Sequence, residues 1–311
     1  MPRPQEWAGL EGLIFVAKRL VEGLYAGGHA TPQAGPGIEF HDYRSYSPGD
    51  DPANIDWKLY GRTDRLYLRR FRWFTDLHAA VMVDYSASMN FSGLNSHGET
   101  DVSRSAMTKL RYARTLAAAI AFLTVRQADR VGLGIYADRL VKHLPLGGTW
   151  SHLMQVCQML EKTRPVQGVG DAAAGLRYAH ELMRRSGHKR GLVVLISDLL
   201  EEPAPLFDGL NRLRHDRCDV IVFQVLTPQE LDLSGLHSNA RLALVDMETR
   251  KQVRTHIGQV QRRYAEVIGE HLTTIRRGCL SRGVDYNLLT TDQPVIEALR
   301  RYVMRRAGMR G

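Results

Sequence analysis

The chain has 311 residues, 44% of them hydrophobic, so it is long enough for one or two globular domains with a sizeable core. Its net charge of +9 comes without a zinc-finger, basic-zipper or ribonucleoprotein motif, which argues against a nucleic-acid partner and suits an acidic protein partner. It has no apolar run long enough for a membrane span, no signal-peptide pattern and no Cys-x-x-Cys pair, so we expect a cytoplasmic protein without a zinc ribbon or disulfide framework.

The first predicted element is an amphipathic helix over residues 7–25, where apolar residues recur at helical spacing. Gly27 and Gly28 end it, and a loop rich in Gly and Pro follows. We expect the helix to pack against the main body of the protein. Together with the next segment it forms a predicted N-terminal unit, residues 1–75.

A charged and aromatic segment over residues 39–71 follows. It contains a Pro-Gly turn, an Asp-Pro helix start, a short predicted helix over 55–60 and a predicted strand over 64–74. We interpret its charges as a buried ion-pair network that docks the segment onto the main domain, with a partner-binding surface as the alternative. The marked residues of this segment are Arg44, Pro48, Gly49, Asp50, Asp51, Asp56, Trp57 and Arg62, with Phe40 and Tyr46 on the apolar side of the joint.

Residues 76–308 alternate between strand and helix patterns. This alternation predicts an α/β fold with a doubly wound, mostly parallel sheet flanked by helices. The predicted strands are 78–83, 130–136, 141–146, 191–197, 219–226 and 285–289, with a hairpin from 241–247 and 253–255. The predicted helices are 105–128, 151–162, 172–185, 206–214, 260–277 and 295–304.

Two of the predicted strands end in carboxylates. Asp84, Ser86 and Ser88 follow the first as Asp-x-Ser-x-Ser, and Asp198 follows the strand over 191–197. If these strands are neighbours in a parallel sheet, both carboxylates come out at its carboxyl edge, where open α/β sheets place their ligands. Carboxylate and hydroxyl oxygens suit Mg²⁺ or another divalent cation. The alternative is that each motif is only a polar turn.

This constellation resembles the metal-ion-dependent adhesion site of von Willebrand factor A domains. There, an Asp-x-Ser-x-Ser loop, a Thr from a second loop and an Asp from a third surround one cation. The resemblance places Gly170 at the Thr position, followed by Asp171. Asp171 is either a substitute oxygen donor or the N-cap of the next helix, and we favour the cap because Asp satisfies free amides there.

The segment over residues 39–71, with Thr227-Pro-Gln-Glu230 and residues 245–249 and 285–292, resembles the domain-of-unknown-function 58 family. The resemblance implies a von Willebrand factor A-like domain, on which we expect the N-terminal helix and this segment to pack. It also implies a non-enzymatic adaptor for a MoxR-type AAA+ ATPase in protein maturation or chaperone-like remodelling.

Two other functions stay open. A metal-dependent hydrolase on the same loop needs a general base, and His97 is the nearest histidine in the sequence. A metal-free scaffold is the other, because Gly170 removes one expected ligand. The sequence has no Walker A loop, so ATP hydrolysis would have to come from a partner.

Overall fold

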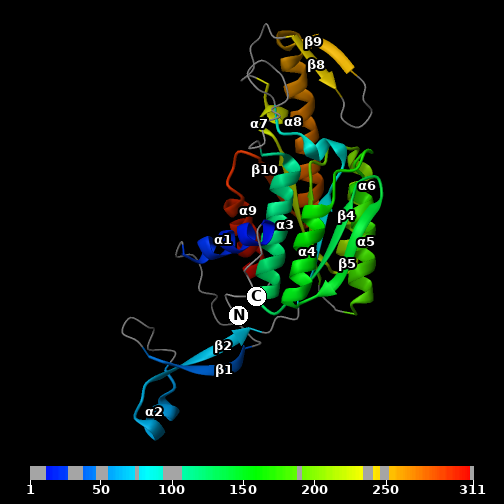
Figure 1. The fold of residues 1–311 in the computed structure, drawn as a ribbon. Helices are drawn as coiled ribbons and strands as arrows, with labels where there is room; N and C mark the ends of the chain where they lie inside the picture. The colour runs from blue at the N-terminus through cyan, green and yellow to red at the C-terminus, as the bar shows by residue number, and fades with distance from the viewer. Residues whose placement is uncertain are drawn as a thin grey trace.

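The computed structural model describes residues 12–26, 38–46, 55–73, 77–93, 107–187, 191–233, 241–245 and 252–308. Its centre is a six-stranded sheet (Figure 1). In spatial order the strands are β10 (Asp285–Thr290), β7 (Asp219–Leu226), β6 (Gly191–Ser197), β3 (His78–Asp84), β4 (Arg130–Tyr136) and β5 (Leu140–Gly147). All neighbours pair in parallel except β5, which pairs antiparallel with β4. The predicted doubly wound, mostly parallel sheet is therefore confirmed.

Helices cover both faces of the sheet (Figure 1). One face packs against α1 (Leu13–Ala26), α3 (Lys109–Arg126), α4 (Trp150–Lys162) and α9 (Val295–Gly308). The other packs against α5 (Ala172–Arg185), α6 (Pro203–His215) and α8 (Ile257–Ser281), and the short α7 (Pro228–Leu231) precedes α8. The expectation that the N-terminal helix packs against the main body is confirmed.

Strand β3 shows why the central strands read as continuous apolar runs. Val81 and Val83 belong to the core on the α3 face, whereas Ala80 and Met82 belong to the core on the α5 face. Side chains of a strand alternate between the two faces of its sheet, so a strand covered on both sides must be apolar at every position. The whole of β3 is accordingly buried.

The long alanine-rich helix is shorter than predicted at its carboxyl end and begins at a cap. The Thr108 side chain accepts a hydrogen bond from the Arg111 amide, and α3 begins at Lys109. The helix ends at Arg126, because Ala128 has φ +62°, in the left-handed region that an α-helix cannot include. The predicted start at residue 105 lies outside the described residues.

Two small antiparallel sheets lie outside the central one. Strand β1 (Ile38–Ser45) pairs with β2 (Tyr67–Trp73), and α2 (Trp57–Thr63) lies between them in the sequence. Strand β8 (Arg241–Val245) pairs with β9 (Gln252–His256), which confirms the predicted hairpin. Figure 1 shows β8 and β9 at the start of α8, and β1, β2 and α2 extending from the opposite end of the molecule.

The described residues of the family-specific segment lie away from the central sheet, and its docking on the main domain stays a prediction. Trp57 is 60% exposed, and α2 stands away from the central sheet (Figure 1). Within the segment, Ile55 and Leu68 form a β-bridge with each other and both side chains are buried. A unit that satisfies its own apolar residues in this way has less to gain from docking.

None of the described helices combines the length and the apolar character that crossing a membrane requires. The division at residue 75 and the cytoplasmic location stay predictions.

Candidate functional site

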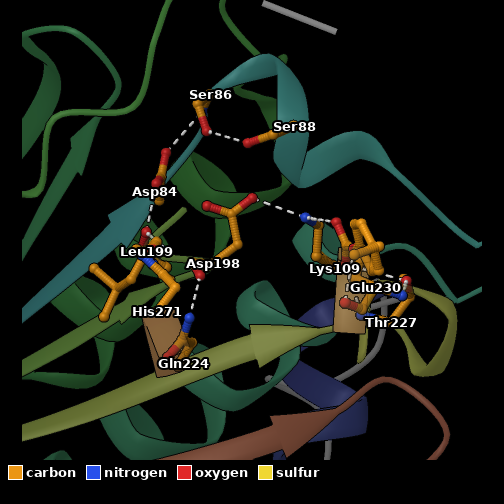
Figure 2. A network of polar contacts seen from close by, with 12 residues as sticks. Asp84, Ser86, Ser88, Lys109, Asp198, Leu199, Gln224, Thr227, Glu230 and His271 are labelled. Carbon is orange, nitrogen blue, oxygen red and sulfur yellow. Dashed lines mark hydrogen bonds and ion pairs between the residues drawn. The ribbon is translucent and has the colours of Figure 1, made fainter. Parts of the chain in front are cut away.

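The two carboxylate-bearing loops meet at the carboxyl edge of the sheet. Strands β3 and β6 are parallel neighbours, with Val83 opposite Ile196, so Asp84 and Asp198 emerge side by side. Figure 2 shows both carboxylates with Ser86 and Ser88 above the strand ends. The predicted convergence of these four residues is confirmed.

Asp84 is fully buried and held by the protein on both carboxylate oxygens. The Ser86 amide donates to its Oδ1 at 2.8 Å, and the Ser197 hydroxyl donates to its Oδ2 at 2.6 Å. Burial, and then the charge of Asp198, raise the pKa of Asp84 to about 7. A negative charge at this point is therefore costly, and a cation beside Asp84 would relieve that cost.

Tyr85 anchors the loop that carries the two serines. Its ring is fully buried, its hydroxyl donates to the Leu160 carbonyl oxygen of α4 at 2.6 Å, and Arg114 Nε donates to that hydroxyl at 3.2 Å. The loop is thus fixed from beneath. The Ser86 and Ser88 hydroxyl oxygens lie 3.0 Å apart.

Asp198 is paired with a buried lysine that the sequence analysis missed. Lys109 Nζ lies 2.8 Å from Asp198 Oδ2 and 2.5 Å from Glu230 Oε1, and the Lys109 side chain is 0% exposed (Figure 2). Burial lowers the pKa of Lys109, but the two carboxylates outweigh burial and hold the pKa above its ordinary value. Lys109 is therefore a charged ammonium inside the site.

Glu230 was also missed, although the sequence carries a signal for it. Thr227-x-x-Glu230 is a capping-box pattern, and in α7 both of its reciprocal hydrogen bonds form. The Thr227 amide donates to Glu230 Oε2 at 2.8 Å, which leaves Oε1 for Lys109. Tyr264 of α8 donates to the Glu230 carbonyl oxygen at 2.8 Å. No comparable sequence signal marks Lys109.

The chain that follows Asp198 is strained and firmly held. Leu199 has φ +48°, a backbone angle that residues other than glycine rarely adopt. Such strained residues often occur in functional loops. Its amide donates to the Ser197 hydroxyl at 3.0 Å, and His271 Nε2 donates to its carbonyl oxygen at 2.7 Å. Gln224 Nε2 donates to the Asp198 carbonyl oxygen at 2.7 Å. These bonds set the direction of the Asp198 side chain.

A further, partly buried acid, Glu201, borders the site. Its Oε1 accepts a hydrogen bond from the Ala172 amide at the start of α5 at 3.0 Å. Burial, and then the charges of Asp84 and Asp198, raise the pKa of Glu201 to about 8. The carboxylates of the site therefore disfavour one another's negative charge, and Lys109 is the cation bonded to two of them, Asp198 and Glu230.

The second loop lies where the resemblance placed it. A Cβ added to Gly170 would lie 3.2 Å from Asp84 Oδ2 and 3.5 Å from the Ser86 hydroxyl oxygen, so residue 170 borders the donors. Asp171 is the N-cap of α5: its Oδ1 accepts from the Ala173 amide at 2.9 Å, and Arg177 donates to its Oδ2 at 3.1 Å. Both of its oxygens are in use, which agrees with the predicted cap.

The donor set fits a small divalent cation. Mg²⁺ binds octahedrally at about 2.1 Å, so adjacent ligand oxygens lie about 3 Å apart, as the Ser86 and Ser88 hydroxyls do. Asp84 supplies a carboxylate, and Mg²⁺ usually keeps several waters. Among the described residues no group of three or more His, Cys, Asp and Glu side chains can hold a metal ion, so such a cation depends on the serines.

Those predicted signature residues that the structure describes do not join this site. Asp56 caps α2, since its Oδ1 accepts from the Leu59 amide at 3.0 Å. Arg62 is exposed within α2, and Arg44 lies in β1 opposite Leu68. Pro48, Gly49, Asp50 and Asp51 lie outside the described residues.

Comparison with known proteins identifies the family. The model of the family described as "Protein of unknown function DUF58" matches residues 42–274. The chain belongs to the DUF58 family. The match spans β2, the site loops and most of α8, so the DUF58 resemblance seen in the sequence is confirmed.

Relatives and solved structures add the following similarities. Uncharacterized proteins of Mycobacterium tuberculosis and Mycobacterium bovis are 27% identical over 310 residues, covering 97% of this chain and 90% of each relative. The conserved hypothetical protein BatB from Bacteroides thetaiotaomicron is similar at 14% identity and a TM-score of 0.49, covering 75% of this chain and 99% of that one. The SpRpn10 VWA domain is similar at 11% identity and a TM-score of 0.42, covering 73% and 95%.

Proposed function

We propose that this DUF58 protein is a non-enzymatic adaptor that binds a protein partner at the carboxyl edge of its sheet through a divalent cation. Asp84, Ser86 and Ser88 would hold the cation, and Asp198 would act from beside it. The observation that carries the proposal is the convergence of these oxygen donors on one rigid edge, with the Ser86 and Ser88 hydroxyl oxygens 3.0 Å apart. The cation, Mg²⁺ or another hard divalent ion, supplies an open coordination position for a carboxylate.

The rest of the molecule supports recognition of an acidic partner. The net charge of +9 attracts negatively charged proteins and speeds their encounter. The donor loop is fixed by Tyr85 and the Asp198 loop by His271, so both are organised before a partner arrives. Binding to a preorganised site costs less entropy than ordering a loose one.

A MoxR-type AAA+ ATPase is the partner we propose within this class. The DUF58 resemblance implies it, and the chain has no Walker A loop with which to bind ATP itself. On this proposal the adaptor presents substrate proteins, or an assembling complex, to the ATPase for maturation or remodelling.

The geometry supports binding better than hydrolysis. A metal-assisted hydrolase needs a general base within reach of the cation. Figure 2 shows His271 beside the loop that follows Asp198, but its Nε2 donates to the Leu199 carbonyl oxygen and so is not available as a base. His97 lies outside the described residues.

The test measures binding of the full chain to the purified MoxR-type ATPase of the same genome. Wild type, D84N and S88A are compared, and D208N serves as control because Asp208 is an exposed carboxylate on α6. We expect D84N and S88A to weaken binding at least about tenfold and D208N to have no effect, because only the first two change the donor set. Circular dichroism confirms that each variant is folded.

An arm with EDTA complements the variants. An ATPase needs Mg²⁺ for its own nucleotide, so loss of binding in EDTA counts only if D84N reproduces it without EDTA. Binding that ignores both EDTA and D84N would contradict the proposal and favour a metal-free scaffold. Hydrolysis of a model ester that D84N abolishes would contradict it in favour of the hydrolase.

A further inference from the structure

We infer that Lys109 is a built-in competitor of the divalent cation, so that the free protein holds the cation weakly and a partner carboxylate is needed to retain it. The inference rests on the proposed function and assigns a role to a residue outside the predicted ligand set. Partner and metal would then bind together, and neither would bind well alone.

Lys109 is fixed in place rather than free to move aside. Its ammonium is fully buried and contacts Asp198 at 2.8 Å and Glu230 at 2.5 Å. Each partner is itself held: the backbone of Asp198 by Gln224, and the Glu230 carboxylate by Thr227. Lysines are almost never fully buried unless paired in this way. The positive charge is therefore a permanent part of the site.

The ion pair with Lys109 neutralises the negative charge of Asp198, which a cation at this site would otherwise use. Asp198 Oδ2 is bound to Lys109, so Asp84 is the one predicted carboxylate ligand without a protein cation bonded to it among the described contacts. An ammonium one carboxylate away also repels a divalent ion, most strongly where water is excluded. Gly170 supplies no side-chain oxygen that would compensate.

A partner carboxylate restores the missing charge. An Asp or Glu that enters the open position of the cation gives it a second carboxylate ligand, as Mg²⁺ sites in proteins commonly have. By linkage, a partner that raises the affinity for the cation is itself bound more tightly by the same factor when the cation is present. Because Lys109 weakens cation binding in the free protein, the cation is held tightly only when the partner carboxylate is present.

The test is a Mn²⁺ titration of the full chain without any partner, read from the electron paramagnetic resonance signal of free Mn²⁺. We expect K109M to bind Mn²⁺ about tenfold more tightly than wild type or better. E230Q breaks the Lys109–Glu230 ion pair but removes a negative charge and keeps the ammonium, so we expect its Mn²⁺ affinity to be no higher than that of wild type. K142M, at an exposed lysine on β5, should match wild type.

K109M leaves two carboxylates without their counterion, so the double variant K109M/E230Q provides a second reading if K109M does not fold. It keeps the net charge unchanged and should still bind Mn²⁺ more tightly than wild type. Equal affinities of wild type and K109M would overturn the inference while leaving a cation-dependent adaptor intact. An equal gain in Mn²⁺ affinity in K109M and E230Q would also overturn the inference. Loss of the ion pair, which loosens the site, would then explain both results without any repulsion by Lys109. If neither wild type nor K109M binds Mn²⁺, the inference and the cation in the proposed function both fail.

Discussion

Gly170 is the residue at which this chain departs from the metal-site pattern that it resembles. It borders Asp84 and Ser86 closely enough that a side chain there would face the donors. A glycine there adds no side-chain oxygen to the donors. At the residue scale, the weak affinity that we infer for the cation has two separate causes, the charge of Lys109 and the missing donor at 170.

Restoring that donor should strengthen cation binding. We expect G170T to raise Mn²⁺ affinity about tenfold, because its hydroxyl would lie beside Asp84 and the carboxylate needs to move only slightly to admit a Cβ at 3.2 Å. G170V has nearly the same shape without the hydroxyl and is the matched control. A gain of equal size in G170V would show that packing, and not a new ligand, is responsible.

At the scale of elements, α2 is a short helix that carries an exposed aromatic pair. Trp57 and Tyr60 are 60% and 38% exposed, and their rings meet edge to face at 6.2 Å. The apolar residues that hold the unit together lie elsewhere in it, at Ile55 and Leu68.

Substitution at Trp57 separates this arrangement from the docking that the sequence had favoured. We expect W57A to lower the free energy of unfolding by less than about 1 kcal/mol, because little of the ring is buried. L68A should cost about 2–4 kcal/mol in the stability of the β1–β2 unit, because it leaves a cavity. Urea unfolding followed by tryptophan fluorescence and circular dichroism measures both. A loss in W57A as large as that in L68A would support the docking interpretation.

At the scale of the whole molecule, α9 is tied to the amino edge of the sheet by a buried ion pair. Arg306 and Asp129 contact each other with side chains that are 4% and 0% exposed, and Asp129 Oδ1 also accepts from the Leu77 amide just before β3 at 3.2 Å. The pair joins the last helix to a loop 177 positions earlier.

Replacing one residue of this ion pair should destabilise the protein far more than replacing both. We expect R306M to lower the free energy of unfolding by about 3 kcal/mol or more, because a buried carboxylate loses its counterion. The double variant D129N/R306M should recover part of that loss. R305M removes a neighbouring exposed charge and should cost less than about 0.5 kcal/mol. Thermal unfolding compares the four proteins, and equal effects of R305M and R306M would contradict the structural role of the pair.

The sequence was sufficient to predict the central sheet and the meeting of Asp84, Ser86, Ser88 and Asp198 at one edge of it. Strands β3, β6 and β7 are β-branched apolar runs bounded by polar turns, and such runs have few other uses in a globular chain. Asp84 and Asp198 each come directly after one of these runs, so parallel pairing of β3 with β6 was enough to bring them together. Local patterns also indicated the Asp171 cap, which needs only the amides that follow it.

Only the tertiary structure revealed which residue lies beside these predicted ligands. Lys109 lies 89 positions from Asp198 and 121 from Glu230, and a lysine on a helix is ordinarily expected to face water. Its burial follows from the crossing of α3, β6 and α7 at one edge of the sheet, which no local pattern encodes. The sequence by itself thus determined which oxygens gather at this edge, because strand ends are local, whereas long-range packing decided which charge opposes them.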